Sequence, residues 1–122
     1  MPRISVTKEI EISASHWLPG HATCGAVHGH NYRIQVTLTG ETLRDGMLLD
    51  FAVLKDALKR RVEQPMDHRM LNKLTECPTA EWMAQWIFEQ MAEYFVGNDR
   101  GLRVYRVRVW ETSTSFATYE ED

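Results

Sequence analysis

Two long stretches of this sequence alternate between apolar and polar residues, and a short segment separates them. The first covers residues 3–16 and the second covers residues 28–40. Such alternation is typical of a β-strand that buries one of its faces. The segment between them contains Pro19, Gly20 and Gly25, which indicate a loop. We therefore predict that the two stretches are strands joined by this loop into a hairpin.

Three histidines lie on the expected buried faces of these strands. His28 and His30 are two positions apart, so their rings point to the same side of a strand. His16 ends the first strand and comes beside them if the hairpin forms. Three neutral imidazoles can hold one divalent ion and leave a coordination position open, as in catalytic zinc sites. The alternative is that the rings only pack or form hydrogen bonds, which is what we expect of His21.

Two helices are predicted to follow the hairpin. Asp50 can cap the first helix, whose apolar residues recur at helical spacing, and Pro65 is expected to stop it. Residues 66–72 are predicted to form a connection. Thr79 can cap the second helix, and Glu81 suits the positive end of its dipole.

Two further strands are predicted near the C-terminus, at residues 103–111 and 114–119. One face of the first consists of Tyr105, Val107, Val109 and Glu111. A carboxylate at the end of an apolar face is costly to bury without a partner. Glu111 therefore either reaches water at the strand end or binds a ligand that donates two hydrogen bonds. The resulting order, ββααββ, is that of an α+β fold.

Composition narrows the class of protein. A chain of 122 residues fits a single domain over residues 1–122. The net charge of −3 argues against nucleic acid as the main partner. Neither a membrane span nor a signal peptide is indicated, so we expect a cytoplasmic protein. Cys24 and Cys77 are too few for a disulfide framework and are expected to be thiols, with Cys77 an inert small residue.

Two more features could carry chemistry. Cys24 lies four residues before His28. Asp67 directly precedes His68, and a carboxylate beside an imidazole can fix its tautomer and raise its basicity. As a dipeptide the pair is a weak signal, because adjacent residues in a solvated loop need not touch.

These features together resemble the 6-pyruvoyl-tetrahydropterin synthase family over essentially the whole chain. The motifs that carry the resemblance are Ala14-Ser15-His16, Leu18-Pro19-Gly20, Cys24 through His30, Leu49-Asp50-Phe51, Asp67-His68 with Leu71-Asn72, Pro78-Thr79-Ala80-Glu81, and Glu111-Thr112. The resemblance implies a T-fold subunit, an antiparallel sheet with two helices on one face. It also implies that three subunits close a β-barrel and that two trimers stack into a homohexamer.

The resemblance also implies a set of site residues. Zinc would be bound by His16, His28 and His30. Cys24 would be the catalytic thiol, with Asp67 and His68 as its proton-transfer partners. Glu111 would anchor the pterin ring of the substrate.

The spacing between Cys24 and His28 is similar to that of the family's 6-carboxy-tetrahydropterin branch, which belongs to queuosine biosynthesis. That branch implies conversion of 7,8-dihydroneopterin triphosphate to 6-carboxy-5,6,7,8-tetrahydropterin, acetaldehyde and triphosphate. One departure is that Thr23 precedes the cysteine, where the branch often has lysine, so the triphosphate ligands stay unassigned.

Three alternatives remain open at this point. The first is a pyruvoyl-type synthase or a related pterin side-chain lyase. The second is a non-catalytic zinc-dependent binding module, which would need neither the thiol nor the Asp-His pair. The third is a uricase-like relative, against which the three histidines count.

Overall fold

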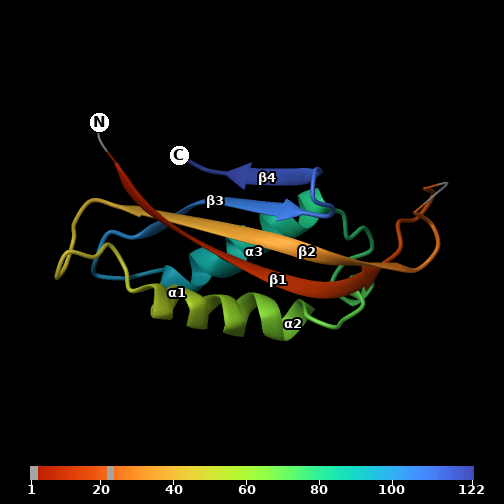
Figure 1. The fold of residues 1–122 in the computed structure, drawn as a ribbon, viewed down its shortest axis with the longest axis horizontal. Coiled ribbons are helices and arrows are strands. Elements are labelled where there is room, and N and C mark those ends of the chain that lie inside the picture. Colours follow the sequence, from red (N-terminus) through yellow and green to blue (C-terminus); the bar gives the residue numbers. More distant parts are fainter. Residues whose placement is uncertain (1–2, 22–23) are drawn as a thin grey trace.

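The computed structural model describes residues 3–21 and 24–122; Thr23 lies outside the described residues. The chain forms a four-stranded antiparallel sheet in the order β1-β2-β3-β4, with its helices packed on one face (Figure 1). The strands are β1 (Ile4–His16), β2 (His28–Gly40), β3 (Arg103–Trp110) and β4 (Phe116–Glu120). This confirms the predicted ββααββ order and the expected sheet with helices on one side.

The hairpin of β1 and β2 is the longest pairing in the sheet. Its register runs from Ile4 opposite Gly40 to His16 opposite His28. Ile12, Tyr32 and Ile34 on its inner face are almost fully buried. The period-2 pattern fixes this register, because a slip by one residue would turn every apolar side chain to the opposite face.

The helical layer begins at α1 (Phe51–Leu58), and Asp50 caps it by accepting a hydrogen bond from the Ala52 N–H. It continues through a π-helical turn, η1 (Lys59–Glu63), into α2 (Gln64–Met66). After the short 3-10 turn η2 (Leu71–Lys73), Thr79 caps α3 (Ala80–Phe95) through the Trp82 N–H. Both predicted caps are confirmed.

The prediction that Pro65 stops the first helix is wrong. The helix reaches Met66 because η1 widens the turn before the proline, where the Gln64 N–H bonds to the Lys59 carbonyl. Pro65 then falls in the first turn of α2, a position at which proline is tolerated. The helix ends when Asp67 turns to an extended backbone.

The prediction that Tyr105 shares a face with Val107 and Val109 is also wrong. The register of β2 with β3 shifts after Thr37, so that Leu38 lies opposite Val104. Tyr105 is the extra residue of this β-bulge, and Val104 takes its place on the buried face. A bulge reverses the alternation beyond it, which a strict period of two cannot anticipate.

The core lies between the inner face of the sheet and the helices. α1 and η1 contribute Leu54, Leu58 and Val62, and α3 contributes Met83, Ile87 and Met91, all fully buried. Among the residues described, no helix combines the length and apolar character that a membrane crossing requires.

Candidate metal centre and its surroundings

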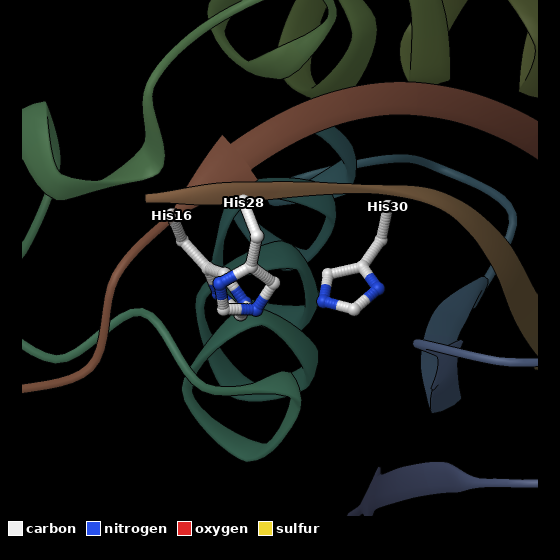
Figure 2. Close-up of side chains that lie close together, drawn as sticks. All are labelled: His16, His28 and His30. Atoms are coloured by element: carbon white, nitrogen blue, oxygen red, sulfur yellow. Dashed lines mark hydrogen bonds between the residues drawn. The ribbon is translucent and has the colours of Figure 1, made fainter. Parts of the chain in front are cut away.

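The predicted histidines meet at one end of the hairpin. His16 lies opposite His28 across the strand pair, and His30 follows on the same face of β2. Figure 2 shows the three rings converging on one small space. One nitrogen from each ring lies within 4.8 Å of the others, so the three residues could hold a metal ion. His16 is fully buried, and His28 and His30 are half-buried.

Hydrogen bonds set the tautomers of two of these rings. The Nδ1 of His16 lies 2.8 Å from the Pro78 carbonyl, and the Nδ1 of His28 lies 2.8 Å from the Ala26 carbonyl. A carbonyl only accepts, so each Nδ1 must carry the hydrogen. The two Nε2 atoms, 3.0 Å apart, then point lone pairs at each other. A shared cation relieves this repulsion, which makes the donor set fit a metal.

The third imidazole also has a ligand atom in need of a partner. The Nε2 of His30 is buried and, within the described part of the chain, makes no hydrogen bond. Burial lowers the pKa of His30 more strongly than the nearby Glu111 raises it. Burial, the largest of these effects, therefore favours the neutral ring, which is the form that binds metals.

Glu111 lies beside this cluster at the end of β3. Its Oε1 is 3.6 Å from the His30 Nε2, and its side chain is 29 % exposed. Tyr32 lies beneath the rings, with its hydroxyl oxygen 3.2 Å from the Nδ1 of His16. Burial and then the Glu111 charge raise the pKa of Tyr32, so its hydroxyl stays protonated. The Glu111 carboxylate is therefore partly open to solvent at the rim of the three-imidazole cluster.

Cys24 lies in the loop between β1 and β2, and its side chain is half-buried. The Leu18 N–H donates to the Cys24 carbonyl at 2.8 Å, which closes the loop on itself. The Cys24 N–H donates to the Nδ1 of His21 at 2.9 Å. His21 is therefore a hydrogen-bonded surface group, as expected, and it also holds the backbone of the thiol-bearing residue.

Asp67 and His68 are in contact, as an acid-base pair requires. The Nδ1 of His68 lies 3.1 Å from the Oδ2 of Asp67. The Ser13 N–H donates to Asp67 Oδ1 at 2.9 Å, and this bond is the main cause that lowers the pKa of Asp67. His68 has a left-handed backbone, with φ 58°, and its side chain is 81 % exposed. Such a conformation is uncommon outside glycine, and Asp45, with φ 53°, adopts it as well.

The pair is attached to the outer edge of β1. The His68 N–H donates to the Ser13 carbonyl at 2.6 Å, and the Ser15 N–H donates to the Arg69 carbonyl at 3.0 Å. A shallow hollow of about 440 Å³ lies over this end of the β1–β2 hairpin, and its lining includes Ser13, Asn31, His30 and His68. No hydrogen bond or ion pair between described residues joins the Asp67–His68 pair to the three imidazoles.

Comparison with known proteins identifies the family. Residues 5–122 match the family described as 6-pyruvoyl tetrahydropterin synthase. The chain belongs to this family. A Synechocystis protein named 6-carboxy-5,6,7,8-tetrahydropterin synthase is 37% identical over 122 residues, covering 93% of this chain and 91% of the relative. A Haemophilus influenzae protein of the same name is 32% identical over 143 residues, with 95% and 98% covered.

The fold agrees with this assignment. The structure of the Caenorhabditis elegans 6-pyruvoyl tetrahydropterin synthase superposes with a TM-score of 0.85 at 28% identity, covering 100% of this chain and 98% of that one. The chain is therefore a T-fold, as the resemblance implied. Named members of the family are tetrahydropterin synthases, a class of lyases.

Sequence reasoning missed three groups that hold the residues of the candidate site in position. The carbonyls of Pro78 and Ala26 orient the imidazoles, and backbone atoms carry no signal in a sequence. Asn72 clamps the strand end, because it accepts from the Trp17 N–H and donates to the Trp17 carbonyl, each at 3.0 Å. Asn72 belongs to one of the motifs that carry the resemblance, but the sequence predicted no role for its side chain.

Proposed function

We propose that residues 1–122 act as one cytoplasmic enzyme domain that converts 7,8-dihydroneopterin triphosphate to 6-carboxy-5,6,7,8-tetrahydropterin, acetaldehyde and triphosphate, in queuosine biosynthesis. The observation that carries the proposal is the three-imidazole cluster, with two Nδ1 atoms committed to carbonyls and a carboxylate at its rim. The named relatives support the substrate class.

The metal proposed for this site is Zn²⁺, held by His16, His28 and His30. Three neutral ligands would leave the ion its full charge, so that it polarises hydroxyl groups of the substrate side chain as a Lewis acid. The carbonyls of Pro78 and Ala26 accept the Nδ1 hydrogens of His16 and His28, which orients the rings and leaves each Nε2 for the ion, as is usual for histidines that bind zinc.

Proton transfer is assigned to Cys24, Asp67 and His68. We propose that the Cys24 thiolate takes a proton from a substrate carbon that bears a hydroxyl group. Asp67 accepts the Nδ1 hydrogen of His68, which leaves the Nε2 of that ring to move protons at the neighbouring carbon. Ionised Asp67 is favoured by the Ser13 N–H that bonds to it.

Glu111 is assigned to recognition of the pterin ring. Its two carboxylate oxygens match the amino group and the ring N–H of a pterin, because two parallel donors then meet two acceptors. Its position beside His30 supports this role, since the ring would be bound next to the proposed ion.

We further propose that each site is completed by a neighbouring subunit, in a trimer or a dimer of trimers. β1 and β4 each have a single neighbour in the described sheet, so both edges can pair with other copies. His68 extends outward from the β1 edge and is 81 % exposed, as expected for a group that serves the site of another copy.

The decisive experiment is incubation of the purified, zinc-loaded protein with 7,8-dihydroneopterin triphosphate, followed by mass analysis. Formation of 6-carboxy-tetrahydropterin with acetaldehyde is the expected result. The C. elegans structural relative favours a second candidate, the pyruvoyl-type reaction, which would release triphosphate without acetaldehyde. No turnover, together with tight pterin binding that survives Cys24→Ala, would instead indicate a non-catalytic binding module.

A further inference from the structure

A tyrosine hydroxyl lies where the three-imidazole cluster meets the apolar core. Tyr32 follows His28 and His30 on the same face of β2. The next two residues of that face are Ile34 and Val36, which are fully buried, as is Tyr32 itself. A phenylalanine ring would occupy nearly the same space, so packing alone does not explain why this position carries a hydroxyl.

The buried hydroxyl has a hydrogen-bond partner in one of the three imidazoles. Its oxygen lies 3.2 Å from the Nδ1 of His16, and within residues 3–21 and 24–122 it makes no other hydrogen bond. A hydroxyl that is removed from water costs free energy unless it is hydrogen-bonded. The contact with His16 therefore accounts for the polar group at this depth.

Two acceptors share the Nδ1–H of His16. This nitrogen carries the hydrogen because it lies 2.8 Å from the Pro78 carbonyl, which only accepts. The Tyr32 oxygen, slightly farther away, is then the second acceptor of the same N–H. Rotation of the imidazole would break both bonds, so together they fix the plane of the ring and keep its Nε2 beside the Nε2 of His28.

The Tyr32 ring also packs against two of the imidazoles. Its centroid lies 6.1 Å from that of His16 and 5.4 Å from that of His30, with interplanar angles of 83° and 65°. These edge-to-face contacts restrict tilting of both rings. The hydroxyl lies on the Nδ1 side of His16, whereas a shared ion would lie on the Nε2 side. Tyr32 is thus placed to orient ligands and not to be one.

We propose that Tyr32 is a positioning residue that holds His16 in its metal-binding orientation and thereby raises the affinity of the centre for its ion. Acceptors behind a metal-binding imidazole fix its tautomer and make it more basic, and the loss of such a partner typically weakens metal binding about 10–100-fold. The inference rests on the zinc assignment within the proposed function, but not on the reaction.

Competition for zinc between the metal-free protein and a chromophoric chelator tests this role without any substrate. Tyr32→Phe removes the hydroxyl and keeps the ring. Its zinc affinity should be about tenfold below that of the parent, the low end of the range, because the Pro78 carbonyl still holds His16. Tyr119→Phe is the matched control, since it removes a hydroxyl that bonds to Glu121 away from the cluster, and it should bind zinc like the parent.

Thermal unfolding separates positioning from a purely structural role. Metal-free Tyr32→Phe should unfold close to the midpoint of the metal-free parent, whereas the rise in midpoint on adding zinc should be smaller in the variant. Equal zinc affinity of Tyr32→Phe and the parent would overturn the inference, even if the variant were less stable. A parent that binds no zinc would overturn it together with the metal assignment. The expected loss of affinity would support the inference even in a protein without turnover, so a failure of the proposed reaction is recognised separately.

Discussion

The imidazoles of His16 and His28 direct lone pairs at each other across 3.0 Å, so the cluster needs a cation to be stable in its neutral form. We predict about one zinc ion per chain in the purified protein and nearly complete loss of that ion in His28→Ala. Metal analysis of dialysed protein measures both. His21→Ala is the matched control, since His21 bonds to Cys24 outside the cluster and its loss should leave the zinc in place. Full occupancy in His28→Ala would refute the assignment.

At Cys24 the prediction separates catalysis from metal binding. Cys24→Ala should abolish turnover while the zinc content and the thermal midpoint stay near those of the parent, because the thiol is assigned to proton transfer. Metal analysis and product formation on the same sample provide the measurement. Zinc lost along with the thiol would make Cys24 a ligand and would require a different mechanism.

Asp67 should make folding stability depend on pH in a defined direction. The Ser13 N–H holds the pKa of Asp67 below its usual value of about 3.9. A carboxylate whose pKa is lowered in the folded state contributes its full stabilisation of the fold at any pH above its pKa in the unfolded state. This contribution is lost as the pH falls through its pKa in the folded state. The free energy of unfolding of the parent should thus exceed that of Asp67→Asn at about pH 7, and the difference should shrink below about pH 4. A difference that stays constant with pH would contradict this account.

Among the secondary-structure elements, the hairpin was the most predictable. The alternation in residues 3–16 and 28–40 shows which face of each strand is buried. Pairing of the two strands then places His16 opposite His28. The caps at Asp50 and Thr79 were equally readable, because a short polar side chain before an apolar helix has a local cause.

The features that sequence reasoning missed depend on contacts between distant segments. The π-helical turn before Pro65 and the bulge at Tyr105 are set by how each element meets the core, not by local propensity. For the site, the face shared by the histidines was predictable, whereas the dipeptide Asp67-His68 alone did not predict that the two side chains touch. The position of this pair on the β1 edge required the fold, because a loop residue has no periodicity to place it.

Asn72 connects the segment of the Asp67–His68 pair to the loop of Cys24, since both of its hydrogen bonds go to the Trp17 backbone. Asn72→Ala should destabilise the fold by about 1–2 kcal/mol, the net value of two hydrogen bonds. Asn72→Asp should lose less, because it keeps the acceptor for the Trp17 N–H. Urea unfolding measures all variants, and Lys73→Ala, an exposed neighbour in η2, should change little. Equal stability of Asn72→Ala and the parent would show that the clamp is unimportant.

At the scale of the whole molecule, the chain presents the parts of the proposed site in two directions. The imidazoles and Glu111 lie on the helical side of the sheet, whereas the Asp67–His68 pair follows the β1 edge at Ser13. The hydrogen bonds of residues 67–69 occupy that edge only near Ser13 and Ser15. Among the described residues, no other backbone hydrogen bond is made to this edge of β1, so a neighbouring copy can pair with its earlier part.

This arrangement predicts that two inactive variants restore activity to each other. Cys24→Ala lacks the thiol and His68→Ala lacks the imidazole, so each homo-oligomer should be inactive. The two variants are unfolded together and refolded as mixed oligomers. Some interfaces between chains will then combine an intact thiol from one chain with an intact Asp67–His68 pair from the other. Activity should therefore return in part and should peak at an intermediate mixing ratio.

The control is mixing the folded variants without subunit exchange, which should restore nothing. Native mass spectrometry verifies that mixed oligomers have formed, and zinc content verifies that their metal centres are filled. His68 is 81 % exposed, and no described bond links it to the three imidazoles, so a partner copy is the expected recipient of its proton chemistry. If verified mixed oligomers show no more turnover than either variant alone, the thiol and the pair act within one chain, and the shared-site arrangement is wrong.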